Sequence, residues 1–116
     1  MHIVTAVLTV ALALIIGAAG IPKILNMGPA GKNAEHLGIS TSLNRAIGIL
    51  ELCATAGLLG GFVVEHLAIA AAAGVSLLII GALITHIRVK DPMSAMIPAL
   101  GVETLALAVL ALQIAW

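Results

Sequence analysis

The chain has 116 residues, of which 62% are hydrophobic and only 9% are charged, against roughly 25% charged residues in a soluble domain. A soluble domain of this length exposes a large share of its surface and cannot hide so much Leu, Ile, Val and Ala, so lipid is the expected solvent. The formal net charge is zero, which gives no reason to expect a nucleic-acid partner. The single cysteine, Cys53, excludes an internal disulfide and a dithiol mechanism within one chain.

Four apolar stretches follow one another, each close to the roughly 20 residues that cross a hydrocarbon core. The first lacks the positively charged start of a signal peptide, so we expect a retained helix. None alternates polar and apolar residues as barrel strands do. The sequence therefore predicts an all-α, polytopic membrane protein with one domain, 1–116, that forms a bundle of four transmembrane helices at about 3–21, 43–64, 67–87 and 94–116.

The boundaries of these helices carry proline and glycine signals. Pro22 marks the end of the first helix or a kink in it. The connection over residues 26–42 is the only long one, and it is expected to be either a solvated loop or a loop with a short interfacial helix. The fourth helix has two candidate starts. One is Asp91-Pro92, an N-cap followed by proline at the first helical position, and the other is Pro98.

All five basic residues fall on one side of the predicted bundle. Two loops share that side in a four-span topology, and with the adjoining helix ends they hold Lys23, Lys32, Arg45, Arg88 and Lys90. The positive-inside rule puts this side in the cytoplasm and both termini on the other side. We expect a multi-pass protein of the bacterial inner membrane with non-cytoplasmic termini and Trp116 as an outer interfacial anchor.

Small residues recur at helical spacing, as in Gly57-x-x-x-Gly61 and Ala70-x-x-x-Gly74. Such faces let helix backbones approach closely, which matters because lipid provides no hydrophobic drive for association. The pattern predicts tight packing and a narrow cleft in place of a large central cavity. It leaves open whether the partner is a second copy of the chain or another membrane protein.

Ionisable residues within membrane spans are costly, at about 2.5–3.5 kcal/mol on insertion scales. Lys23, Glu51 and His86 all lie in the half of their helices nearest the basic side, and Glu103 reaches a comparable depth if the fourth helix starts late. On one helix His86 and Arg88 lie about 200° apart, so we expect His86 to point inward and Arg88 to snorkel. These five residues are the candidate ligand-binding residues of a polar site in the cytoplasmic half.

Three interpretations of this cluster remain open. In the first, Glu51 and His86 are catalytic acid–base groups or bind a polar headgroup such as a quinone carbonyl. In the second, Glu51 pairs with Lys23 or His86 only to hold the bundle together. In the third, Glu51, Glu103 and His86 bind a metal, for which carboxylate and imidazole ligands are adequate, although no EXXH-type spacing is present and we predict no metal site.

Three motifs carry a family resemblance, namely Gly20-Ile21-Pro22-Lys23, Arg45-Ala46-Ile47-Gly48-Ile49-Leu50-Glu51 and Thr85-His86-Ile87-Arg88. In order and spacing they resemble the DoxX-like family of small four-helix membrane proteins, over nearly the whole chain. Gly-x-x-Lys and Ile-Gly-x-x-Glu are the most specific elements, and Glu103 is not part of the pattern. The resemblance implies a subunit of quinone-linked oxidoreductases or of related membrane assemblies. Relatives with redox dithiols differ from this single-cysteine chain.

The leading hypothesis is a small membrane subunit of a quinone-linked redox system. A lipid-soluble quinone would enter between the helices and reach a pocket of Lys23, Glu51 and His86 near the cytoplasmic side. The sequence has no haem-attachment, iron–sulfur or dinucleotide motif, so the electrons would come from a partner. One alternative is a non-enzymatic scaffold or assembly factor with a structural polar cluster. Another is a cofactor-free isomerase or cyclase that uses Glu51 as the acid, so enzymatic activity stays open.

Overall fold

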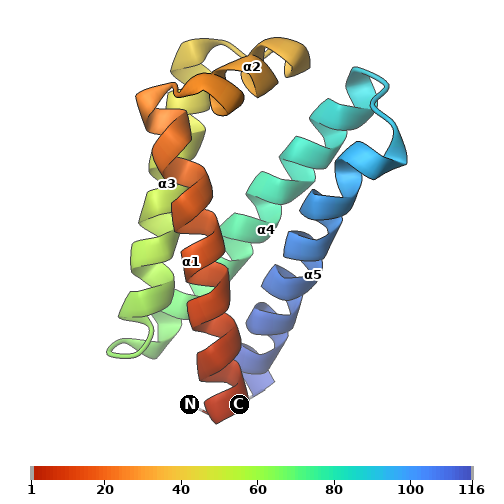
Figure 1. Cartoon of the computed structure of the whole chain (residues 1–116). Coiled ribbons are helices and arrows are strands. Elements are labelled where there is room, and N and C mark those ends of the chain that lie inside the picture. Colours follow the sequence, from red (N-terminus) through yellow and green to blue (C-terminus); the bar gives the residue numbers. More distant parts are fainter. Residues whose placement is uncertain (1, 116) are drawn as a thin grey trace.

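A computed structural model describes residues 2–115, apart from the side chain of Glu65, and these residues form helices and no strand (Figure 1). In chain order the helices are α1 (Ile3–Leu25), α2 (Gly28–Leu37), α3 (Thr41–Gly60), α4 (Glu65–Arg88) and α5 (Met93–Ala115). All except α2 are long and apolar enough to cross a membrane. The predicted all-α membrane bundle is therefore confirmed for the described residues. Trp116 lies outside them.

The bundle consists of two helix pairs that diverge toward one end. The most extensive contacts join α1 to α3 and α4 to α5, while α1 and α5 touch over a shorter length. Figure 1 shows the two pairs close together where the termini lie and apart at the opposite end, which α2 crosses. The core holds fully buried side chains from all four long helices, among them Leu12, Leu58, Val75 and Val109. The divergence leaves room beneath α2.

The helix boundaries lie within four residues of the expected ones. Pro22 lies inside α1, which continues to Leu25 and closes on Asn26 in the left-handed conformation, with φ 52°. The second span, expected at about 43–64, ends at Gly60. The fourth begins at Met93 and contains Pro98, so the earlier of its two candidate starts is the correct one. Proline was expected at the first helical position, but α5 begins one residue after Pro92. The Asp91 side chain bonds to two histidines.

Of the two alternatives for the long connection, the structure has the short helix. Proline occupies the first turn of α2, where its missing N–H is harmless. Gly38 ends the helix with φ 71°, a conformation that favours glycine. Ala34 and Leu37 are buried against the rest of the molecule. An apolar side of α2 thus covers the open end of the bundle.

Glycines bring α1 and α3 into backbone contact near that same end. A Cβ built on Gly48 would lie 2.7 Å from the carbonyl oxygen of Gly20, and one on Gly20 would lie 2.9 Å from that of Gly48. Of the two predicted small-residue faces, Gly57 packs against Ala71 of α4. Gly74, in contrast, would meet no described neighbour within 4 Å. The α1–α3 seam is therefore the tightest part of the polar end, and Gly74 faces open space.

Candidate functional site

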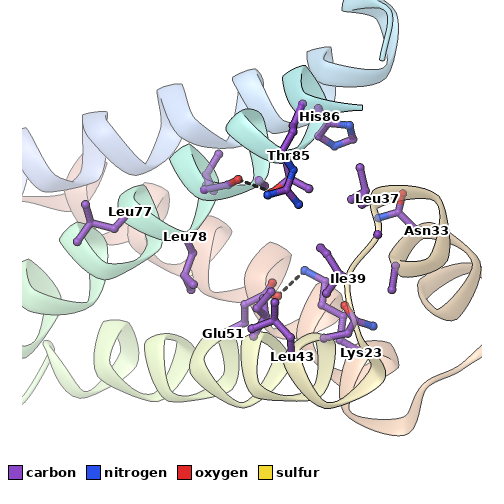
Figure 2. Close-up of a pocket in the computed structure, with 18 of the residues that line it drawn as sticks. Lys23, Asn33, Leu37, Ile39, Leu43, Glu51, Leu77, Leu78, Thr85 and His86 are labelled. Atoms are coloured by element: carbon purple, nitrogen blue, oxygen red, sulfur yellow. Dashed lines mark hydrogen bonds and ion pairs between the residues drawn. The ribbon is translucent and has the colours of Figure 1, made fainter. Parts of the chain in front are cut away.

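An ion pair joins α1 to α3 next to the glycine seam. Lys23 Nζ donates to Glu51 Oε1 (Figure 2). The Glu51 side chain is 6% exposed and that of Lys23 is 28% exposed. A buried carboxylate requires a partner, because leaving it uncompensated is strongly destabilising. The close approach of Gly20 and Gly48 brings the two helices near enough for the pair to form.

This ion pair forms part of the wall of a cavity of about 500 Å³. The opposite wall belongs to α4, with Leu78, Thr85 and His86, and residues of α2 close the end (Figure 2). Small-molecule sites typically occupy about 300–1,000 Å³. The small side chains predicted a narrow cleft. That prediction is wrong at this end of the bundle, because the distance of α4 from α1 and α3 increases toward the end that α2 covers.

Asn44 also lines the cavity, and sequence reasoning missed it. Its side chain is nearly fully buried, and Nδ2 has no hydrogen-bond partner among the described residues. A buried amide N–H without an acceptor is costly, so an acceptor supplied by a ligand would be stabilising. Asn44, Gly48 and Glu51 lie at positions i, i+4 and i+7 of α3, on one helix face. This spacing is the sequence feature that could have identified Asn44.

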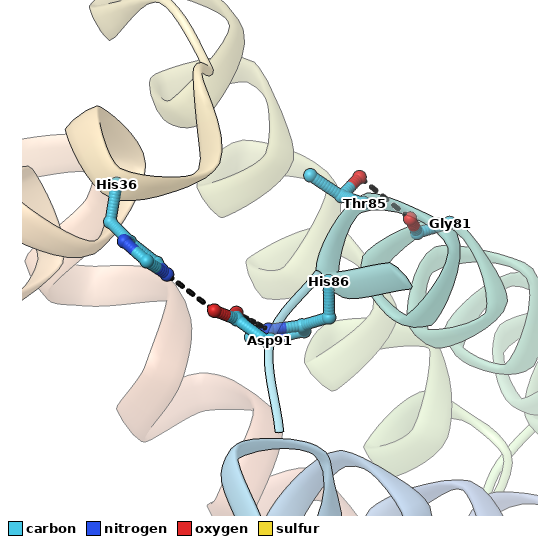
Figure 3. Close-up of polar contacts among 5 residues, drawn as sticks. All are labelled: His36, Gly81, Thr85, His86 and Asp91. Carbon is cyan, nitrogen blue, oxygen red and sulfur yellow. Dashed lines mark hydrogen bonds and ion pairs between the residues drawn. The ribbon is translucent and has the colours of Figure 1, made fainter. Parts of the chain in front are cut away.

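A second polar cluster ties α2 to the far end of α4. His36 Nε2 lies 2.6 Å from Asp91 Oδ1, and His86 Nδ1 lies 2.5 Å from Asp91 Oδ2 (Figure 3). These hydrogen bonds, first that of His36 and then that of His86, hold the pKa of Asp91 below its usual value. His86 therefore lines the cavity as expected, but its hydrogen bond goes to Asp91 and not to Glu51.

The two remaining candidates are placed differently. Arg88 lines the cavity at its α4 wall. Glu103 does not line it, because its Oε1 accepts a hydrogen bond from Ser76 Oγ at 2.5 Å, which joins α5 to α4. Glu103 Oε2 has no partner in the described part of the chain. No set of three His, Cys, Asp or Glu side chains within residues 2–115 is placed to hold a metal ion, so Glu51, Glu103 and His86 are not brought together.

The chemistry of the cavity follows from its donors. The lining contains three side chains with donor groups, namely the ammonium of Lys23, the guanidinium of Arg88 and the amide of Asn44, while the Glu51 carboxylate is an acceptor. Aliphatic side chains make up most of the remaining lining. The arrangement suits an apolar molecule whose head carries hydrogen-bond acceptors such as carbonyl oxygens.

Four membrane-spanning helices with a ligand-sized cavity at the basic end define a small integral membrane protein. The chain belongs to the DoxX-like family, which it matches over residues 7–111. The family expected from the three sequence motifs is therefore confirmed over nearly the whole chain. No curated protein and no solved structure matches the sequence.

Proposed function

We propose that the chain is a small membrane subunit of a quinone-linked redox system and that it binds the quinone head in the cavity beside Lys23 and Glu51. The observation that carries the proposal is a charged pair set in the wall of a mostly aliphatic, ligand-sized cavity. Membership of the DoxX-like family is consistent with it, because the resemblance of the sequence motifs implies a subunit of quinone-linked assemblies. By the positive-inside rule the cavity lies in the cytoplasmic half, with both termini outside.

The cavity residues divide the binding work between them. Lys23 donates a charge-assisted hydrogen bond to one quinone carbonyl, and such bonds are roughly twice as strong as neutral ones. Asn44, whose Nδ2 lacks a partner among the described residues, donates to a second acceptor of the head. Glu51, beside the first carbonyl, accepts or returns a proton as the quinone changes redox state. The electrons come from a partner protein in the membrane.

A second candidate function is favoured by the same ion pair. Glu51 already has a partner in Lys23, and the pair reinforces the α1–α3 seam. In a non-enzymatic scaffold or assembly factor this pair would be structural and the cavity would hold ordinary lipid. The two functions make opposite predictions for a variant that keeps the shape of Glu51 and removes its charge.

The decisive experiment compares Glu51→Gln with Glu103→Gln in lipid nanodiscs. Both variants change a buried carboxyl to an amide, but only Glu51 lines the cavity. Binding of a decyl-substituted benzoquinone is measured by calorimetry, with empty nanodiscs as the blank. Without the Glu51 charge the Lys23 ammonium can extend to the interface, and the charge-assisted hydrogen bond that it donates to the quinone contributes about 1.5–3 kcal/mol. Glu51→Gln should therefore weaken binding by about tenfold or more. Glu103→Gln should bind like the wild type.

The outcomes separate the two functions. A wild-type chain that binds no quinone, or a Glu51→Gln variant with lower thermal stability and unchanged quinone affinity, contradicts the quinone proposal and favours the scaffold. Mass spectrometry of gently purified protein gives an independent check. Co-purified quinone supports the proposed function, and phospholipid alone favours the scaffold.

A further inference from the structure

An apolar groove runs along the outer side of α3 and α4. Its volume is about 510 Å³, and its walls are aliphatic or small, with Leu50, Cys53 and Gly57 from α3 and Leu67 and Gly74 from α4. Along α4 the groove extends from Leu67 to Leu78, roughly 16 Å at 1.5 Å per residue. Among the described side chains, none of those that line it is acidic or basic. The groove is therefore a linear, uncharged channel on the side of the bundle.

The groove adjoins the cavity whose wall holds the ion pair. Leu77 and Leu78 line both, the cavity on one side and the groove on the other. Figure 2 shows these two leucines on α4, beyond Glu51 as seen from the α2 end. The polar groups are confined to the cavity, whereas the groove offers only apolar contacts and Cys53. A polar hollow and an apolar hollow thus lie side by side, with Leu77 and Leu78 in the walls of both.

We infer that the ligand is a single-chain amphiphile whose flexible tail lies in the α3–α4 groove while its head occupies the cavity, as in a quinone with an isoprenoid or alkyl tail. This inference rests on the proposed function and adds a specificity for the tail. Gly74 provides the room, because a Cβ added there would meet no described neighbour within 4 Å.

The shared leucines favour this occupant over a second copy of the chain. A tail attached to a head in the cavity reaches the groove past Leu77 and Leu78, which line both hollows. A helix of another copy would require a matching partner surface, and its binding would not involve the cavity that adjoins the groove. Because lipid tails compete for the same apolar surface, the gain from the groove is packing alone and is expected to be modest.

The test uses three glycine-to-leucine variants and two ligands with the same head. Gly74→Leu fills the groove, Gly81→Leu intrudes on the cavity, and Gly101→Leu adds the same bulk to α5, away from both. A Cβ at each position would have no described neighbour within 4 Å, so all three are expected to fold. The ligands are a tail-free dimethoxy-methyl-benzoquinone and its decyl derivative, titrated into nanodiscs.

Gly74→Leu should weaken binding of the decyl quinone about three- to tenfold, or about 0.7–1.4 kcal/mol, and leave the tail-free quinone unchanged. Gly81→Leu should weaken both ligands, and Gly101→Leu neither. Comparing variants with one ligand cancels its partition into lipid. Equal affinity of the wild type and Gly74→Leu for the decyl quinone would overturn the tail assignment, even with tight binding of the head.

Two further results would overturn the inference in other ways. If the wild type binds neither quinone, the proposed function fails and the tail assignment fails with it. If a spin label on Cys53, the only cysteine, reports a short distance between two copies that Gly74→Leu abolishes, the groove is a dimer interface. Well-separated labels in both proteins support the tail.

Discussion

The two long walls of the cavity are built in opposite ways. On the α1–α3 wall the backbones meet at Gly20 and Gly48, and an ion pair bridges the helices one turn away. On the α4 wall Gly81 has no described neighbour within 4 Å of a built Cβ. In the first wall, α1 and α3 hold each other by direct contact. In the second wall, α4 is held by its bonds to other parts of the molecule. One wall can thus fix the polar groups while the other leaves room for a ligand.

The α4 wall has two attachments that do not depend on the cavity. Ser76 bonds to Glu103 of α5, and neither residue lines the cavity. At its end, His86 bonds to Asp91, which also holds His36 of α2. Substitutions in the first wall should therefore cost the most stability, and those in the attachments of the second should cost less.

The largest effect is expected for Lys23→Met, which removes the cation and keeps the length of the side chain. Glu51 is only 6% exposed and would be left without its partner. Removing one member of a buried pair costs about 3–5 kcal/mol, and the partial exposure of Lys23 suggests about 3 kcal/mol. Unfolding free energy in mixed micelles is the measurement.

The two members of the ion pair differ in exposure, and this difference provides the control. Glu51→Gln should cost less than Lys23→Met, because the lysine left behind can extend its ammonium to the interface. In the double variant Lys23→Met/Glu51→Leu most of the stability should return, since an apolar pair can replace a buried ion pair. Equal losses in both single variants would show that the wall is not fixed by the buried carboxylate.

The next largest effect is a contrast between two glycine-to-alanine substitutions, one of which should lower the stability of the protein while the other raises it. Gly48→Ala places a methyl 2.7 Å from the Gly20 carbonyl oxygen and 2.9 Å from Ile24 Cγ1, and overpacking of this kind costs about 1–3 kcal/mol. Gly81→Ala meets no described neighbour within 4 Å and gains up to about 1 kcal/mol of helix propensity. Thermal unfolding in detergent checks both. A loss of stability in both variants would contradict the open second wall.

Much of this difference between the walls was within reach of the sequence. The lengths of the spans fix the depth of Lys23, Glu51, His86 and Arg88, and a four-span topology brings them to one end, where all four line the cavity. The depth of Glu103 in the fourth span also made it a candidate for the same site. Its orientation was out of reach, because α5 is apolar on nearly every side and has no polar face to show its rotation.

The parts that sequence reasoning missed depend on tertiary placement. Asp91 follows α4 closely, but its bond to His36 requires α2 to lie across the end of the bundle. The 500 Å³ cavity requires the two helix pairs to diverge, which small side chains alone did not predict. Local patterns determine helices and depth, whereas the angles between helices result from the packing of the whole bundle.

A smaller effect is expected for Ser76→Ala, which removes the hydrogen bond between α4 and α5. Glu103 Oε1 would lose its donor, and Oε2 already lacks a partner in the described part of the chain. The loss of such a bond should cost about 1–2 kcal/mol. Quinone affinity should change little, because neither residue lines the cavity.

Thr104→Ala is the matched control for this hydroxyl. Thr104 is the neighbour of Glu103, is exposed, and donates to the carbonyl of Leu100 within its own helix. Its removal should change the unfolding free energy by no more than about 0.5 kcal/mol. If Ser76→Ala also proves neutral, the Ser76–Glu103 contact does not hold α4, and α4 is attached to the rest of the molecule at its ends.

The smallest effect concerns the attachment of α2 to the α4 wall and depends on pH. The hydrogen bonds from His36 and His86 keep the folded-state pKa of Asp91 below its usual value of 3.8. The unfolded chain therefore takes up the proton first, so the stabilisation by Asp91 is complete above about pH 4 and is lost as the pH falls through the folded pKa. Asp91→Asn should remove this acid-dependent loss.

Hydrogen exchange of the Gly28–Leu37 amides, corrected for intrinsic rates, measures the attachment locally. In the wild type, protection of α2 should fall below about pH 4, and in Asp91→Asn it should be low throughout. Glu35→Gln neutralises an exposed carboxylate of the same helix and should keep the profile of the wild type. Full protection of α2 in Asp91→Asn would mean that the buried Ala34 and Leu37 hold it without the histidines, and that the second wall is closed by apolar packing.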